Sequence, residues 1–147
     1  MGIATAQLSP IEQTAFLTEY ARALDSQWPR PILGDALAYD VVGKVDYDFV
    51  GLGVQTSVVC QTALRAKMLD DRVRAFIADH RDAVVVDLGA GLDSGFYRVD
   101  PPSSVDWYSV DLPEIIACTV IIAFARCVIG MVSVGENATT LVMLTYR

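Results

Sequence analysis

Two glycines and one aspartate are spaced as in a nucleoside-binding site. Gly89 and Gly91 form a turn directly after an apolar run, and Asp111 ends a second apolar run, 20 positions after Gly91 (111 − 91). A glycine turn lets the backbone approach a ligand where a side chain would collide. An acidic residue at that distance is where nucleotide-binding βαβ units hold the ribose hydroxyls, because a carboxylate can accept a hydrogen bond from each of them. The residues therefore predict a site for a nucleoside-type cofactor.

The same residues leave other interpretations open. The stretch GAGLDSG has the spacing G-x-G-x-x-x-G, whereas dinucleotide-binding enzymes have G-x-G-x-x-G, so a nicotinamide oxidoreductase is disfavoured. A glycine pair after a strand can also be turn chemistry alone. Asp111 can equally be the cap of a helix entered at Pro113.

The glycine turn belongs to a predicted βαβ unit. Strands are expected at Ala83–Leu88 and Val105–Val110, with a short helical crossover between them. The run from Val84 to Val86 does not alternate with polar residues, which predicts a strand buried on both faces. Strand, turn, helix and strand within about 30 residues indicate an α/β fold.

Three helices are predicted ahead of the first strand, as a helical N-terminal cap over residues 1–80. The first should run from Pro10 to Ser26, because a serine cap, a proline and a capping-box glutamate stand at its start. Asp35 should open a short helix through Val42, and a longer one should run from Ser57 to Asp79. The longer helix has an apolar side (Val59, Ala63, Ala66, Leu69, Val73, Phe76, Ile77) and charged residues assigned mostly to a solvated face (Arg65, Lys67, Asp70, Asp71, Arg72, Arg74, Asp79).

Composition excludes several classes of protein. A hydrophobic content of 53% with 20% charged residues is typical of a globular chain and not of a disordered one. The net charge of −7 argues against nucleic-acid binding, which depends on Lys and Arg facing phosphates. The cysteines Cys60, Cys118 and Cys127 form no CxxC pair, so reduced thiols in the cytoplasm are expected. With His80 as the single histidine, no metal site is predicted, and no signal peptide is recognised.

The last 31 residues, 117–147, are unusually apolar, with only three charged side chains. Ile115 to Ala125 carries no charge, but eleven residues are too few to span a bilayer, and Arg126 follows them. No membrane segment is therefore predicted. Val132–Val134 and Thr140–Leu144 are β-like and predict one or two further strands.

The sequence VVDLGAGLDSGFYRV followed by WYSVDLPE resembles the leucine carboxyl methyltransferase family, and is closest to its bacterial branch of S-adenosylmethionine-dependent O-methyltransferases typified by polyketide methylases. LSPIEQTAFLTEYARALDS and ALRAKMLDD are similar to that branch as well, so the resemblance covers roughly residues 8 to 116. It implies an incomplete Rossmann-like (class I methyltransferase) core behind the helical cap. It also implies S-adenosylmethionine as cofactor and a small-molecule carboxylate or hydroxyl as methyl acceptor.

The resemblance assigns roles to six residues. Gly89 and Gly91 would pass under the methionine and ribose of the cofactor, and Asp93 would face the site just beyond them. Asp111 would hold the ribose hydroxyls, with Leu112 beside it among the cofactor-binding residues. Arg65 would pair with the cofactor's carboxylate, because a planar guanidinium can bind a carboxylate through two parallel hydrogen bonds; Lys67 is a weaker candidate for the same task. Arg65 as an exposed helix charge is the alternative.

No catalytic residue is predicted, because methyl transfer from a sulfonium needs positioning of the acceptor more than acid–base chemistry. The family pattern stops after LPEIIA, so residues 81–116 would be the cofactor-binding half of the core and residues 117–147 an atypical tail. One hypothesis is that the tail is a shifted reading frame or a foreign end on a truncated gene, with the activity of the chain in doubt. The alternative function is a non-catalytic remnant that binds nucleoside weakly or self-associates through an exposed sheet edge.

Overall fold

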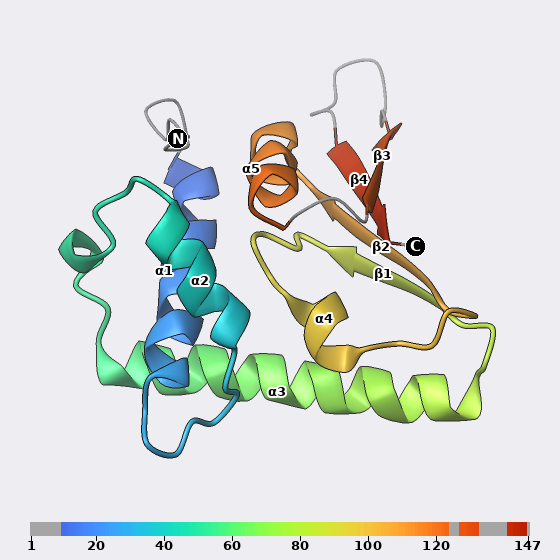
Figure 1. Ribbon diagram of the computed structural model, residues 1–147, viewed down its shortest axis with the longest axis horizontal. Coiled ribbons are helices and arrows are strands. Elements are labelled where there is room, and N and C mark those ends of the chain that lie inside the picture. Colours follow the sequence, from blue (N-terminus) through green and yellow to red (C-terminus); the bar gives the residue numbers. More distant parts are fainter. Residues whose placement is uncertain (1–9, 124–126, 133–140, 147) are drawn as a thin grey trace.

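The computed structural model describes residues 10–123, 127–132 and 141–146, and the side chains of residues 13–119. Three helices come first, and Figure 1 shows them grouped beside and below a small sheet. The elements in order are α1 (Pro10–Ser26), α2 (Ala36–Lys44), a 3-10 turn (Val50–Leu52), α3 (Thr56–Asp79), β1 (Val84–Leu88), α4 (Gly95–Val99), β2 (Asp106–Asp111), α5 (Pro113–Ala123), β3 (Cys127–Val132) and β4 (Leu141–Tyr146). The chain is thus an α/β protein with a helical N-terminal part, as predicted.

Helix α1 has the predicted bounds, although Ser9 and the side chain of Glu12, which carry the predicted start signals, lie outside the described part. It buries Phe16 completely against an aromatic cluster formed by Tyr47 and Phe49, with ring centroids 4.9 and 5.8 Å away. Leu92, from the glycine loop, belongs to the same buried cluster. This packing places α1 against the loop that follows β1.

The connection from α1 to α2 is held by two buried carboxylates, Asp25 and Asp35. Asp25 accepts hydrogen bonds from the backbone N–H groups of Ile32, Leu33 and Gly34 at 2.8, 2.9 and 2.9 Å. Asp35 then caps α2, as predicted, by accepting a bond from the Ala38 N–H at 3.2 Å. Because the two carboxylates satisfy the backbone donors of this loop, they determine where α2 begins.

Replacing Asp25 with alanine is expected to lower the free energy of unfolding by about 2–3 kcal/mol, because it leaves three backbone donors without their acceptor. Urea denaturation followed by circular dichroism measures the change. Asp40→Ala, at an exposed position of α2, is the matched control and should cost less than about 0.5 kcal/mol. Equal stabilities of the two variants would contradict the role given to Asp25.

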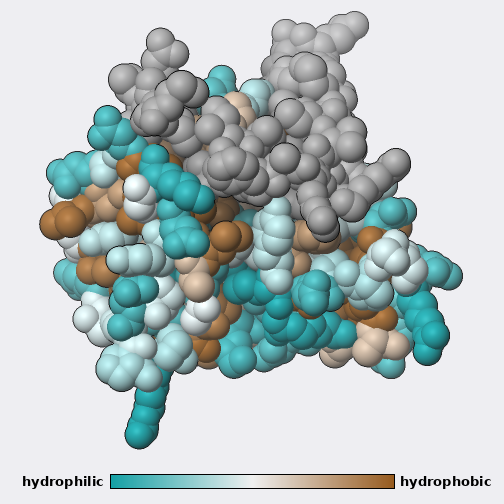
Figure 2. Space-filling model, in the orientation of Figure 1, coloured by the Kyte–Doolittle hydropathy of each residue, from teal (hydrophilic) through white to brown (hydrophobic). Residues whose placement is uncertain are grey.

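Helix α3 begins one residue earlier than predicted, and two features of its predicted faces are wrong. Leu69 and Phe76, assigned to the apolar side, are half exposed, whereas Asp70, assigned to the solvated face, is buried. The reason is that α3 packs against α1 along one part of its length and against α4 along another, so its buried side is not a single stripe. Figure 2 shows hydrophilic residues over much of the lower part of the molecule, where α3 runs.

The sheet has the strand order β1-β2-β4-β3. β1 and β2 are parallel, as the βαβ prediction requires, while β4 is antiparallel to both β2 and β3. The prediction that β1 is buried on both faces is wrong, because Val84, Val86 and Leu88 are 58%, 53% and 74% exposed. β1 is one of the two edge strands of this sheet, and its covered face packs on the core of Ile77, Ala83, Val99, Val105, Trp107 and Ile116.

Both strands after α5 lie in the tail, at bounds that differ from the predicted ones. Of the predicted segments, Val132–Val134 falls mostly outside the described residues, and Thr140–Leu144 overlaps β4. β4 pairs with β2 from Trp107 opposite Tyr146 to Asp111 opposite Val142, so the tail strands extend the same sheet. In the described part of the chain, every helix is too short or too polar to cross a membrane.

Candidate functional site

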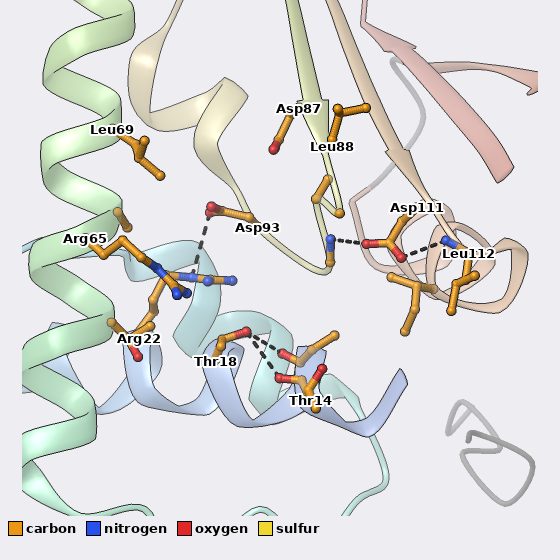
Figure 3. A pocket seen from close by; sticks show the side chains of 17 residues that line it. Thr14, Thr18, Arg22, Arg65, Leu69, Asp87, Leu88, Asp93, Asp111 and Leu112 are labelled. Atoms are coloured by element: carbon orange, nitrogen blue, oxygen red, sulfur yellow. Dashed lines mark hydrogen bonds and ion pairs between the residues drawn. The ribbon is translucent and has the colours of Figure 1, made fainter. Parts of the chain in front are cut away.

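A cavity of about 470 Å³ lies where the carboxyl ends of β1 and β2 face α1 and α3 (Figure 3). Parallel strands present their carboxyl ends at one sheet edge, and ligands of α/β proteins bind there. All six predicted site residues line this cavity: Arg65, Gly89, Gly91, Asp93, Asp111 and Leu112. Arg22, Thr14, Thr18, Thr62, Leu69, Asp87 and Ile115 are among the lining residues that were not predicted.

The backbone conformation of the turn explains why residues 89 and 91 are glycines. Gly89 and Gly91 have φ angles of +68° and +61°, which L side chains rarely adopt. A Cβ atom at Gly89 would meet nothing within 4 Å, and one at Gly91 would lie 3.6 Å from Ala15 Cβ, an ordinary contact. The Gly89 and Ala90 N–H groups donate to the Val110 carbonyl at 2.8 and 3.3 Å, which ties the turn to β2. The space beside Gly89 is therefore open for a ligand.

Asp111 is the last residue of β2, and its carboxylate holds the glycine turn. Oδ2 accepts a hydrogen bond from the Gly91 N–H at 2.6 Å, and Oδ1 accepts one from the Leu112 N–H at 2.7 Å (Figure 3). Neither donor belongs to α5, which begins at Pro113, so these bonds are not those of a helix cap. Each oxygen keeps a further lone pair for a ligand.

Asp87 is a cavity residue that sequence reasoning missed. It is the fourth residue of β1 and lies half-buried, facing the cavity. Burial, followed by the nearby charges of Asp93 and Asp111, raises the pKa of Asp87 to about 6. Its signal was a single carboxylate that interrupts the apolar run of β1 directly before the glycine turn.

Asp93 lines the cavity, and its carboxylate contacts two arginines. Oδ1 lies 2.6 Å from Nη1 of Arg98 and 3.8 Å from Nε of Arg22. Burial alone would raise the pKa of Asp93, but the two guanidiniums and the hydrogen bond from Arg98 hold it below the ordinary value. The main contact of Asp93 is therefore to the protein framework.

Arg98, on the short helix α4, joins segments that are far apart in the sequence. Its Nε and Nη2 donate to the two carboxylate oxygens of Asp70 on α3 at 2.8 and 3.1 Å. Its Nη1 donates to Asp35, the cap of α2, at 2.6 Å, and Ser94 Oγ donates to the same carboxylate. The pairing of Arg98 with these carboxylates was not predicted; the only signal was an arginine within a short, otherwise apolar helix.

Arg22 and Glu19 form a buried ion pair on α1, directly behind the cavity wall. Glu19 is 1% exposed, and Arg22 also approaches Asp35, with Nε 3.4 Å from Oδ2. Burial raises the pKa of Glu19 to about 7; the Arg22 charge opposes this rise, and the charges of Asp35 and Asp93 add to it.

Arg65 reaches the cavity from α3 and is exposed. Within the described part of the chain no carboxylate lies within ion-pairing distance of it, whereas Lys67 pairs with Asp71 at 3.7 Å. Lys67 is not among the cavity-lining residues. Of the two predicted candidates, Arg65 is therefore the one whose charge faces the cavity.

The sequence profile of the leucine carboxyl methyltransferase family matches residues 15–119. The chain belongs to this family. It is 42% identical over 112 residues to the tetracenomycin polyketide synthesis O-methyltransferase TcmP of Streptomyces glaucescens, an alignment that covers 76% of this chain and 42% of that protein. It is 32% identical over 125 residues to a Mycobacterium avium (strain 104) protein named as an S-adenosyl-L-methionine-dependent methyltransferase, with 74% and 40% of the two chains covered.

The family match and the cavity coincide in the sequence. From Ala15 to Ile115 the cavity-lining residues fall within the matched range, and only Thr14 lies outside it. The strands β3 and β4 lie beyond the match. This chain spans less than half the length of the two relatives named above.

Proposed function

We propose that this chain binds S-adenosylmethionine in the cavity and serves as the cofactor-binding part of an O-methyltransferase. The observation that supports this most is the arrangement of Asp111, the glycine turn and Arg65 around one cavity. The cofactor has a ribose with two hydroxyls, a cationic sulfonium and ammonium, and a carboxylate. Such a molecule requires hydrogen-bond acceptors for its hydroxyls, carboxylates near its cationic groups, and a guanidinium that can pair with its carboxylate.

In this proposal each residue has a separate task. Asp111 accepts hydrogen bonds from the ribose hydroxyls through its remaining lone pairs, and Arg65 pairs with the carboxylate of the cofactor. Asp87 places a negative charge near the cationic groups. When bound, the cofactor supplies an activated methyl group on its sulfonium. The residues of this chain bind and orient it, and we propose that the acceptor is a small-molecule carboxylate or hydroxyl.

A dinucleotide fits the cavity less well. Three carboxylates, Asp87, Asp93 and Asp111, surround the glycine turn and would repel a pyrophosphate. The helix that follows the turn, α4, has only five residues, so it lacks the long, aligned helix N-terminus on which dinucleotide enzymes bind phosphate.

Isothermal titration calorimetry of the purified chain with S-adenosylhomocysteine tests the proposal. A saturable heat with one site per chain is the expected result. A flat trace from a sample that is folded by circular dichroism would overturn it. A fluorescence change on adding reduced nicotinamide dinucleotide would favour the oxidoreductase instead.

Two basic residues of α3, Arg65 and Lys67, provide a sharper prediction. Arg65→Ala is expected to weaken binding of S-adenosylhomocysteine about tenfold or more, because a charge-assisted hydrogen bond contributes about 1.5–3 kcal/mol. Lys67→Ala, two positions away and outside the cavity, should change the Kd by less than about twofold. Calorimetry measures both constants, and equal effects would remove Arg65 from the proposed site.

Self-association is a second candidate function, which a different observation favours. β1 is an edge strand, and on one face it carries three apolar side chains that are each more than half exposed, those of Val84, Val86 and Leu88. No lysine or proline interrupts the strand. Light scattering on a gel-filtration column tests this, since a monomer that binds S-adenosylhomocysteine would rule out the purely self-associating remnant. The cytoplasmic location, the domain division at residues 80 and 116 and the shifted reading frame stay predictions.

A further inference from the structure

Directly behind the cavity lining lies a buried acid to which the proposed function gives no task. Glu19 lies on the inner side of α1, and its partner Arg22 lines the cavity. One oxygen of Glu19 binds Arg22, but among the described residues Oε1 is buried without any hydrogen-bond partner. A buried carboxylate oxygen with no donor is costly when it is ionised, and less so when the group carries a proton.

The charges that surround Glu19 also favour a proton on it. Asp35 ahead of α2, Asp70 on α3 and Asp93 in the glycine loop share with Glu19 only two buried guanidiniums, those of Arg22 and Arg98. Asp35, Asp70 and Asp93 each receive a hydrogen bond from Arg98, whereas Glu19 does not. Across the cavity stand Arg65, Asp87 and Asp111. Of the four carboxylates that share Arg22 and Arg98, Glu19 is thus the one with a buried oxygen that no described donor reaches.

Building on the proposed function, we infer that Glu19 is partly protonated in the free protein at neutral pH and loses this proton to solvent when S-adenosylmethionine enters the cavity. The O–H bond of the Glu19 carboxyl group breaks, the carboxylate remains paired with Arg22, and the buffer takes up the proton. The cofactor brings a net positive charge into the cavity. The negative charge that the released proton leaves on Glu19 balances part of this positive charge. Glu19 is therefore a positioning residue that acts through Arg22 and does not touch the cofactor.

The inference distinguishes the cofactor from its product. S-adenosylmethionine and S-adenosylhomocysteine differ by the methyl group and by one unit of positive charge. A unit charge about 10 Å away in a protein interior lowers a carboxyl pKa by about one unit. Since the pKa of Glu19 lies at about 7, a fall of one unit at pH 7 releases about 0.4 protons per cofactor bound. The neutral product should release almost none.

Asp87 also faces the cavity and could contribute to such a signal. Burial, with Asp93 and Asp111 nearby, raises its pKa to about 6, below the value for Glu19, so Asp87 is the more ionised of the two at pH 7. Asp87→Asn, measured at saturating S-adenosylmethionine because the proposed function gives Asp87 a part in binding, separates the two sources. With Glu19 as the source the count of released protons per bound cofactor stays nearly unchanged, whereas its loss would assign the release to Asp87 and overturn the inference.

Calorimetry at pH 7 in phosphate, imidazole and Tris buffers tests the inference, because the slope of the observed heat against the buffer's ionisation heat counts protons. We expect about 0.4 protons released with S-adenosylmethionine, fewer than 0.1 with S-adenosylhomocysteine, and fewer than 0.1 with either ligand for Glu19→Gln. Binding of S-adenosylmethionine with a buffer-independent heat would overturn the inference and leave the proposed function standing. Equal release with both ligands would also overturn it. No binding of either ligand would instead overturn the proposed function.

A second measurement covers the case in which Glu19→Gln fails to fold. The chain has only four glutamates, Glu12, Glu19, Glu114 and Glu136, so ¹³C labelling of glutamate carboxyls gives few signals to assign. One of them should titrate near pH 7 in the free protein and about one unit lower with S-adenosylmethionine bound. Four glutamates that all titrate below pH 5 in the free protein would overturn the inference.

Discussion

Arg98→Ala is expected to lower the free energy of unfolding by about 3–5 kcal/mol, the loss typical of removing one partner from a buried ion pair. The guanidinium of Arg98 binds Asp70 on α3, Asp35 at the start of α2 and Asp93 beside the cavity. Alanine would leave three carboxylates in the interior with Arg22 as their remaining buried cation. A domain of this size is stable by about 5–15 kcal/mol, so the loss is a large share of the total.

Thermal and urea denaturation followed by circular dichroism measure this effect, and the midpoint should fall by roughly 10–20 °C. Lys67→Ala removes an exposed pair on α3 and serves as the control, with an expected cost below about 0.5 kcal/mol. Arg98→Lys should fall between the two, because an ammonium cannot bind both oxygens of Asp70 at once. An Arg98→Ala variant within 1 kcal/mol of the parent would show that the buried network does not stabilise the fold.

Arg98 also shows what the sequence could not predict. Its partners Asp70 and Asp35 are 28 and 63 positions away, so no local pattern relates them to Arg98. Asp70 and Glu19 are buried because α1, α3 and α4 pack together. A prediction from the sequence of one helix assigns charged residues to the solvent-exposed face. The same holds for β1, because its exposure depends on the order of strands in the sheet and not on its own residues.

Local signals, by contrast, were sufficient for the elements and for most of the cavity. Proline at the start of α1, Asp35 at the start of α2 and the two positive-φ glycines act within a few residues of where they stand. The placement of Asp111 beside the glycine turn follows from parallel pairing of β1 with β2, which a βαβ unit requires. Asp87 is placed beside the glycine turn by the same pairing of β1 with β2. It was not predicted as a cavity residue because apolar residues stand on both sides of it in the sequence.

Asp111→Asn is expected to weaken binding of S-adenosylhomocysteine about 100-fold or more. In the proposed site a charged acceptor serves two ribose hydroxyls, and hydrogen bonds to charged groups contribute about 1.5–3 kcal/mol each. Asparagine also offers only one acceptor oxygen, while Asp111 binds the N–H groups of Gly91 and Leu112 at 2.6 and 2.7 Å. The amide NH₂ must therefore face one of these donors, which disturbs the glycine turn.

Loss of the ribose contacts and disturbance of the turn can be separated with a second ligand. An analogue of S-adenosylhomocysteine without the 2′ and 3′ hydroxyls should bind the parent chain weakly, and Asp111→Asn should weaken it further only through the turn. If the variant reduces affinity for both ligands by the same factor, Asp111 acts on the turn alone and does not bind ribose. Asp106→Asn, at the exposed opposite end of β2, is the matched control and should leave both dissociation constants within about twofold. A larger loss for the ligand with hydroxyls would therefore be the direct sign that this strand end recognises a nucleoside.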